Sequence, residues 1–327
     1  MAILSSATAG FIQALSSFDF AQGDAIITSR CDYTSNQIQY LALAQRRGVR
    51  ILYAADRPEG GIDPDAVRDL LARSAGDARR RAVAVSWVPT NSGLVQDVEA
   101  VGAVCEEFDV PYIVDACQAL GQIPIDVGRI KCDYLSVTAR KFLRGPRGIG
   151  FLYASDRALA RGDHPLFVDM RGAKWVAADR YELVDSAHRY EEWEHSYVLV
   201  FGLGAAAEYL RRVGIAVVQR RASALAAHLR DRLAAIPGVR VLDLGRDRCA
   251  IVTAAIAGWE APQVIAALRD RRINASASFL SSALFDFTAK GVASAARFSP
   301  HYYNTEEELD ALVQAVGEIA ATTPASR

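Results

Sequence analysis

The chain has 327 residues, with 37 Lys plus Arg against 38 Asp plus Glu, so its formal net charge is −1. This balance, without a dense basic block, argues against electrostatic binding of nucleic acid. Hydrophobic residues make up 51% of the sequence, ample for a buried core, and the length suggests two domains or one large domain with an appendage.

The cysteines and the apolar segments indicate the cellular setting. The five cysteines are scattered without CxxC spacing, and no uncharged apolar stretch reaches the length of a membrane span. The apolar start at residues 1–4 is too short for a signal peptide. We therefore expect a soluble, cytoplasmic protein that binds neither nucleic acid nor a membrane.

The first half of the chain predicts alternating helices and strands. The predicted helices cover residues 9–16, 35–48, 63–74 and 98–108. The predicted strands cover residues 24–29, 50–54, 82–87, 112–114, 134–137 and 150–153. Such alternation implies parallel strand pairing with right-handed crossovers.

The pattern changes in the second half. A long helical region is predicted at 202–213 and on through 217–236, linking two domains. Beyond it, strands at 239–242, 250–257 and 274–278, with helices at 262–271 and 306–320, indicate a small α+β unit. The expected division is a large domain over residues 1–215 and a linker helix with a small C-terminal domain over residues 216–327.

Two segments carry side chains suited to cofactor chemistry. Asp115 ends an apolar strand, with Gln118 one helical turn on, and ligands bind at that edge of open α/β sheets. Lys141 follows in a loop with Gly145 and Gly148. A lysine can form a Schiff base with an aldehyde cofactor, and a carboxylate can keep the cofactor's ring nitrogen protonated, which is pyridoxal phosphate (PLP) chemistry. In isolation, Asp115 could equally cap the next helix, and Lys141 could be a solvated surface group.

The same reasoning gives candidate phosphate ligands. Thr138 and Arg140, beside the lysine, offer a hydroxyl and a cation. The small residues of Ser5-Ser6-Ala7-Thr8 precede a predicted helix and would expose backbone N–H groups to an anion. These residues would also make an ordinary helix N-cap.

Four motifs in a fixed order carry a resemblance to a known family. They are Ala7-Thr8, Asp115-Ala-Cys-Gln118, Thr138-Ala-Arg-Lys141 with the glycine-rich segment 145–150, and the segment 297–305. From Ser5 nearly to its end, the chain resembles the class V aminotransferase family, in its cysteine desulfurase-like and isopenicillin N epimerase-like branch. The resemblance implies an α/β fold, PLP-dependent transferase fold type I, with a large mostly parallel-sheet domain that binds PLP and a small C-terminal α+β domain.

The resemblance also implies roles for individual residues. Lys141 would be the internal aldimine lysine and the base that moves the Cα proton. Asp115 would pair with the ring nitrogen, and Gln118 would contact the ring oxygen. The residues implied to hold the phosphate are Ala7, through its amide, with Thr8, Thr138 and Arg140. Arg140 stands where desulfurases usually have histidine.

Three further residues gain a role from the resemblance. Tyr33 aligns with the aromatic residue that stacks on the cofactor ring, although the residue alone could be a half-buried tyrosine. Thr90 lies in a loop that sits beside the cofactor in the family. Arg297 corresponds to the arginine that binds the substrate's α-carboxylate in a bidentate pair, although a lone arginine is more often part of a surface ion pair. No histidine has metal-ligand spacing with a partner, so no metal is expected.

The chain also departs from the family. Desulfurases carry a loop cysteine that accepts sulfur as a persulfide, and no cysteine follows Cys249 here. Family members also carry a segment before the position of Ser5, so we expect a shortened N-terminal segment. The family region that matches residues 191–197 approaches the cofactor of the neighbouring subunit, which implies a homodimer.

These observations leave three functions open. The first is a lyase that cleaves a C–S bond, or a desulfurase-like enzyme without the loop cysteine, acting on an amino acid or an amino-acid conjugate. The second is a class V aminotransferase or an amino-acid epimerase. The third is a non-catalytic dimeric relative, against which the presence of Lys141, Asp115, Gln118 and Arg297 argues.

Overall fold

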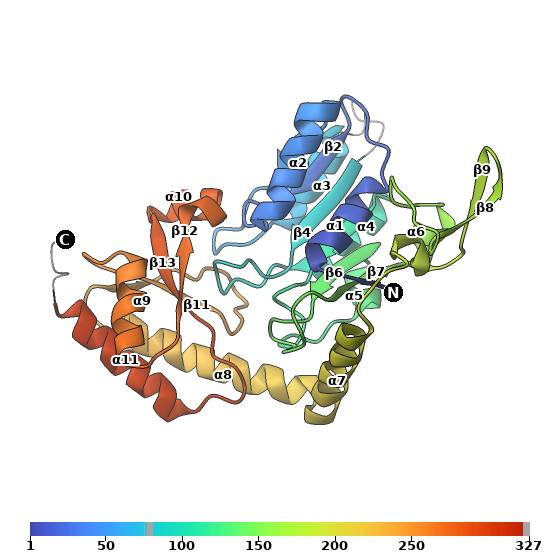
Figure 1. Cartoon of the computed structure of the whole chain (residues 1–327). Coiled ribbons are helices and arrows are strands. Elements are labelled where there is room, and N and C mark those ends of the chain that lie inside the picture. Colours follow the sequence, from blue (N-terminus) through green and yellow to red (C-terminus); the bar gives the residue numbers. More distant parts are fainter. Residues whose placement is uncertain (75, 77–80, 323–327) are drawn as a thin grey trace. The chain divides into compact units, whose positions relative to one another are not determined.

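The computed structural model of the chain describes residues 1–74, 76 and 81–322 (Figure 1). The chain forms two compact units. The first comprises Met1–Arg57, Ile62–Trp87 and Asp97–Arg212, and the second comprises Pro58–Gly61, Val88–Gln96 and Val213–Arg327. The domain division expected at residues 215 and 216 stays a prediction, and it did not anticipate that two short early segments group with the second unit.

A seven-stranded sheet forms the centre of the first unit, in the order β1-β7-β6-β5-β4-β2-β3. Its strands are β1 (Ala2–Leu4), β2 (Ala25–Thr28), β3 (Arg50–Tyr53), β4 (Arg81–Ser86), β5 (Tyr112–Asp115), β6 (Tyr134–Thr138) and β7 (Gly150–Ala154). The pairs among β2 to β6 are parallel, which confirms the mostly parallel sheet. β7 runs antiparallel to β6, because residues 139–149 return the chain without a crossover helix. β1 was not predicted.

Helices cover this sheet. They are α1 (Ala7–Ser16), α2 (Thr34–Arg47), α3 (Pro64–Ser74), α4 (Val98–Glu107), α5 (Val127–Ile130) and α6 (Asp156–Ala160). The four helices predicted here are confirmed, with ends shifted by a few residues. Phe11 of α1 and Tyr40 of α2 pack with Ile26, Ile113 and Tyr134 of the strands in one buried cluster. Burial of such side chains is the main favourable term in folding, so this cluster fixes α1 and α2 on the sheet.

The end of the first unit was predicted less well. An antiparallel hairpin of β8 (Ala173–Ala177) and β9 (Arg180–Leu183) projects from the body of the unit (Figure 1). After the 3-10 helix Ala187–Tyr190, α7 (Tyr197–Val213) follows, and α8 (Ile215–Ala234) begins the second unit. The predicted continuous helical region is broken at Gly214, whose φ of 87° is incompatible with a helix. Within the described residues, no helix has the length and apolarity that crossing a bilayer requires.

The second unit contains a four-stranded antiparallel sheet in the order β10-β11-β13-β12. Its strands are β10 (Val239–Val241), β11 (Val252–Ile256), β12 (Ser276–Phe279) and β13 (Ser294–Phe298). Its further helices are α9 (Ala261–Asp270), the 3-10 helix Leu280–Ser282, α10 (Leu284–Lys290) and α11 (Glu306–Ala320). The α+β character is confirmed, whereas α10 and β13 were not predicted. α11 begins with a capping box between Thr305 and Glu308, directly before the helix predicted at 306–320.

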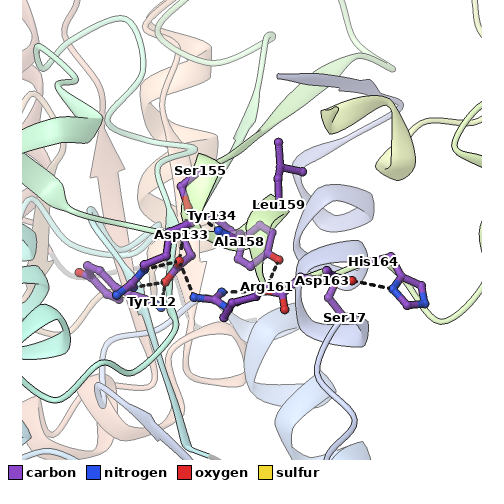
Figure 2. Close-up of polar contacts among 12 residues, drawn as sticks. Ser17, Tyr112, Asp133, Tyr134, Ser155, Ala158, Leu159, Arg161, Asp163 and His164 are labelled. Atoms are coloured by element: carbon purple, nitrogen blue, oxygen red, sulfur yellow. Dashed lines mark hydrogen bonds and ion pairs between the residues drawn. The ribbon is translucent and has the colours of Figure 1, made fainter. Parts of the chain in front are cut away.

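A charged network, which we call the amino-end network, closes the amino-terminal end of β6. It consists of Asp133, Arg157, Arg161 and Asp163 (Figure 2 shows three of them with their neighbours). The fully buried Asp133 carboxylate accepts from Arg157 at 2.5 Å and from Arg161 at 3.0 Å. Asp163 accepts from Arg161 at 2.6 Å and from the Tyr134 hydroxyl at 2.9 Å. Each carboxylate is therefore balanced by a guanidinium, as expected of a structural charge cluster.

Candidate active site

Several residues singled out in the sequence gather at the carboxyl ends of β5 and β6. Asp115 is the last residue of β5, and Thr138 is the last residue of β6. Lys141 lies in the turn that follows Thr138, and Gln118 lies in the turn that follows Asp115. Asp115, Gln118 and Thr138 are buried. This is the edge at which parallel α/β sheets bind ligands.

An aromatic ring and an amine meet at this edge. The Lys141 amine lies 5.9 Å from the centre of the Tyr33 ring, and Tyr33 is the N-cap residue of α2. Burial raises the pKa of the Cys117 thiol well above its usual value; the negative charge of Asp115 raises it further, and the positive charge of Lys141 opposes this. Asp115 and Lys141 therefore act on the same buried side chain, which places the amine, the carboxylate and the ring in one neighbourhood.

The loop that carries Lys141 is held from both sides. Its backbone is closed by a hydrogen bond from Arg144 N to Lys141 O at 2.9 Å, and the Arg144 guanidinium lies 4.9 Å from the ring of Tyr209 on α7. The turn after Gln118 packs directly on this loop, because a Cβ at Gly121 would lie 2.3 Å from Leu143 N. The positions of the lysine and of the β5 turn are therefore coupled sterically.

Asp115 is surrounded by neutral hydrogen-bond donors. Its Oδ1 accepts from Cys117 N at 2.9 Å, and its Oδ2 accepts from Asn36 Nδ2 at 3.2 Å. The first bond caps the turn that follows β5, whereas the simpler interpretation of Asp115 expected it to cap a helix there. Among the described residues, Asp115 forms no ion pair with an arginine or a lysine, so its charge remains to be balanced.

A group of residues behind Asp115 was not predicted from the sequence. Asn36 Nδ2 also donates to Asp32 Oδ1 at 3.1 Å, and Asp32 accepts from the Tyr40 hydroxyl at 2.8 Å and from the Ser86 hydroxyl. Asp32, Asn36 and Tyr40 are spaced by four residues, which places them on one face at the start of α2. That spacing of polar residues before and within a helix was the available signal.

The start of α1 provides backbone donors. Ser6 is the N-cap residue, and its hydroxyl accepts from Ala9 N at 3.1 Å. The amides of Ala7 and Thr8 precede it, where a helix has no internal acceptors, so they are available to an anion. A cavity beside this turn is lined by Ser5 and Ala9 together with Gly148, His195 and other residues. Arg140, another candidate for the phosphate, is exposed.

Arg297 lies in the second unit, on β13. Its Nε is buried, and among the described residues it has no hydrogen-bond partner. Burial lowers the pKa of this guanidinium, against the opposing influence of Cys249 and Asp243. A buried donor on a charged group is costly when it is unsatisfied, so this atom is suited to an anionic ligand. The surface ion pair of the alternative interpretation is not present within the described part of the chain.

Thr90 is half-buried in a loop of the second unit that is anchored on both sides. Asn91 Nδ2 donates to Ser282 O at 2.6 Å, and Gly93 N donates to Asp243 Oδ1 at 2.9 Å. Asp243 in turn forms a buried ion pair with Arg230 at 2.9 Å. The loop is therefore rigid, while the role of Thr90 towards a cofactor stays a prediction.

Comparisons with known proteins identify the family. The model of the aminotransferase class V family matches residues 3–312. The chain belongs to this family. A probable cysteine desulfurase of Methanothermobacter thermautotrophicus is 27% identical over 305 residues, which cover 92% of this chain and 74% of that protein. The chain is therefore a cysteine desulfurase-like class V enzyme.

Solved structures agree in fold. Apo cysteine desulfurase from Thermococcus onnurineus gives a TM-score of 0.87 at 23% identity, covering 98% of this chain and 78% of that one. The cystine C–S lyase C-DES gives 0.82 at 23% identity, covering 99% and 82%, and a mutant of C-DES carries glycine covalently linked to PLP. At this level of identity these structures establish the fold, PLP-dependent transferase fold type I, and the individual roles of the site residues stay predictions.

Proposed function

We propose that the chain is a PLP-dependent enzyme that cleaves a C–S bond in a cysteine-type amino acid or conjugate. The observation that carries this proposal is the meeting of the Lys141 amine, the Tyr33 ring and the buried Asp115 carboxylate at the carboxyl edge of the sheet. PLP requires an amine for its aldehyde, an acid for its ring nitrogen and donors for its phosphate. The Lys141 amine, the Asp115 carboxylate, which forms no ion pair among the described residues, and the Ala7 and Thr8 amides fit these needs.

The chain's own residues would divide the work as follows. When bound, PLP supplies an electron-poor ring that stabilises negative charge on the adjacent substrate carbon. Lys141 would hold the cofactor, then take the proton from the substrate Cα. Asp115 would accept the hydrogen bond of the protonated ring nitrogen, and Tyr33 would cover the ring face. Arg297 would bind the substrate carboxylate through its buried Nε.

The fate of the sulfur distinguishes the chemical outcomes. In this chain the segment 274–283 contains no cysteine, so sulfur cannot leave as a persulfide on a residue there. After loss of the Cα proton, departure of sulfur from Cβ and hydrolysis would give pyruvate, ammonia and sulfide from cysteine. Buried Cys249 and Cys117, whose thiol pKa values are raised by burial, are poor sulfur acceptors.

Product analysis tests this function. Protein reconstituted with PLP is incubated with L-cysteine and with L-cystine, and pyruvate, alanine, ammonia and sulfur products are measured. We expect pyruvate, at a rate that Lys141→Ala lowers by about 10³-fold and Lys174→Ala leaves unchanged. Transfer of the amino group to a 2-oxo acid without sulfur release would instead establish the aminotransferase alternative. If the protein does not bind PLP, the remaining alternative is a non-catalytic relative of the family.

We further propose that the chain acts as a homodimer. Large apolar side chains are exposed on the first unit, including Phe167, Trp175, Tyr197, Val198 and Phe201, each at least 70% exposed. Contiguous exposed apolar surface marks interaction sites, so these side chains are candidates for an interface, and cyclic dimers are the commonest homo-oligomers. Sedimentation velocity of the full chain should give a dimer, and a monomer at micromolar concentration would contradict this.

A further inference from the structure

A second buried carboxylate lies behind Asp115. The Asn36 side-chain nitrogen donates to Asp115 Oδ2 at 3.2 Å and to Asp32 Oδ1 at 3.1 Å, so one amide bridges the two acids. Asn36 is 1% exposed, Asp115 5% and Asp32 9%. The bridge is therefore shielded from water and fixed by packing against the sheet.

Asp32 is held as an acceptor. Besides Asn36, its donors are Thr28 Oγ1 at 2.9 Å, Tyr33 N at 2.6 Å, the Tyr40 hydroxyl at 2.8 Å and the Ser86 hydroxyl. An ionised carboxylate has about four acceptor sites on its two oxygens and no donor. Five donors thus meet about four sites, and a protonated carboxyl would accept fewer of them. Burial raises the pKa of Asp32, and the charge of Asp115 adds to this, whereas the hydrogen bonds from Ser86, Tyr40 and Asn36 oppose the rise and favour the carboxylate. Among the described residues no arginine or lysine forms an ion pair with Asp32.

We propose that Asp32, acting through Asn36, is a positioning residue for Asp115 and a second negative charge that strengthens the binding of a protonated cofactor ring. This inference rests on the proposed function. Asn36 fixes one oxygen of Asp115 while Cys117 N fixes the other, which sets the plane of the carboxylate. Asp32 adds its charge without contacting the ligand, since its own acceptor sites are occupied by protein.

Within the described part of the chain, no titratable group around this pair forms an ion pair with either carboxylate. Burial, with a contribution from the Asp32 charge, raises the pKa of Tyr40 on α2 and of Tyr53 on β3, so both stay neutral. Burial likewise raises the pKa of Cys117, which stays a thiol. The Lys141 amine lies 5.9 Å from the ring of Tyr33, whose backbone N–H donates to Asp32, and its positive charge acts on Cys117 together with the charge of Asp115. Two carboxylates and one amine thus share a site of low dielectric constant, where an additional cation is favoured.

Ligand pairs that differ only at the ring nitrogen test this inference without an activity assay. The probes are PLP and its analogue in which C–H replaces the ring nitrogen, with dissociation constants measured by fluorescence. In wild type, PLP should bind more tightly than the analogue. Asp32→Asn and Asn36→Ala should each weaken PLP about tenfold and the analogue less than twofold. Asp32→Glu, which restores the charge, should recover most of the PLP preference.

Matched variants separate the role from general destabilisation. Asp133→Asn removes a buried carboxylate from the other end of the same sheet and should change neither dissociation constant by more than twofold. Tyr40→Phe removes a single donor from Asp32 with little loss of packing, and it replaces Asp32→Asn if that variant fails to fold. It should weaken PLP binding about twofold. Equal changes in the dissociation constants of PLP and the analogue in Asp32→Asn and Asn36→Ala would overturn the inference. A wild-type chain that binds neither probe would instead overturn the proposed function, and this inference with it.

Discussion

The two ends of the seven-stranded sheet hold their buried carboxylates by opposite means. At the amino end, Asp133 is matched by the guanidinium groups of Arg157 and Arg161. At the carboxyl end, Asp32 and Asp115 are matched by amide, hydroxyl and backbone donors. Both arrangements satisfy hydrogen bonds, but within the described residues only the carboxylates at the amino end form ion pairs.

This difference separates a structural cluster from a binding site. Removing one partner of a buried ion pair leaves the other charged group exposed to a low dielectric, so the amino-end network stabilises the fold through its charges. Uncompensated carboxylates weaken the apo protein and favour any ligand that brings a positive charge. The carboxyl end is therefore the place to expect a cationic ligand group, such as a protonated ring nitrogen.

The largest expected effects on stability and on PLP affinity come from replacing one buried aspartate with asparagine at each end of the sheet. Asp133→Asn should lower the free energy of unfolding by about 3 kcal/mol, because it leaves two guanidinium groups without their buried partner. Asp115→Asn should change the apo stability by less than about 1 kcal/mol, because an amide can still accept from Cys117 N. The PLP affinity of Asp115→Asn should fall about 100-fold, because the variant loses a charged hydrogen bond to the ring nitrogen.

Urea unfolding of both apo variants, with PLP titration of each, measures these four quantities. The comparison of the two ends is wrong if both variants lose stability equally, or if Asp133→Asn loses as much PLP affinity as Asp115→Asn.

A glycine pair gives a smaller, steric contrast. Gly121 has φ of 93°, and a Cβ there would lie 2.3 Å from the backbone of Phe142 and Leu143 in the lysine loop. Gly121→Ala should therefore cost about 2–4 kcal/mol and displace Lys141, with weaker PLP binding. Gly162, near the amino-end network, has φ of 79° and open space around its Cβ position.

Gly162→Ala is thus the matched control, because it introduces the backbone strain of a positive φ without a steric clash. It should lower the free energy of unfolding by about 1 kcal/mol. Thermal unfolding and PLP titration of the two variants measure the contrast. Unchanged PLP binding in Gly121→Ala would show that the β5 turn does not hold the lysine loop.

Most of the fold could be predicted from periodicity and end signals. The apolar strands of the parallel sheet and the capped helices α1 and α11 were predicted close to their observed bounds. β13 was missed because its sequence, Ser-Ala-Ala-Arg-Phe, has few of the β-branched or aromatic residues typical of strands. β8 and β9 are mostly exposed and so lack a buried apolar face to detect. The break between α7 and α8 depends on a single glycine.

The site was predictable only in part. Lys141 and Asp115 were visible because motifs surround them in sequence. Asp32 and Asn36 act on Asp115 from 79 and more positions away, through the pairing of β2, β4 and β5, which no local pattern encodes. Thr90 and Arg297 lie in the second unit, and their roles in the site stay predictions.

The attachment point of PLP tests the central claim most directly. The chain contains four lysines, Lys131, Lys141, Lys174 and Lys290, so a covalent label can be assigned without ambiguity. Holoprotein is reduced with borohydride and digested, and the peptides are analysed by mass spectrometry. We expect the PLP-derived mass on the peptide that contains Lys141, and no yellow colour in Lys141→Ala. A label on any other lysine, or a Lys141→Ala variant with the wild-type absorption spectrum, would contradict the account.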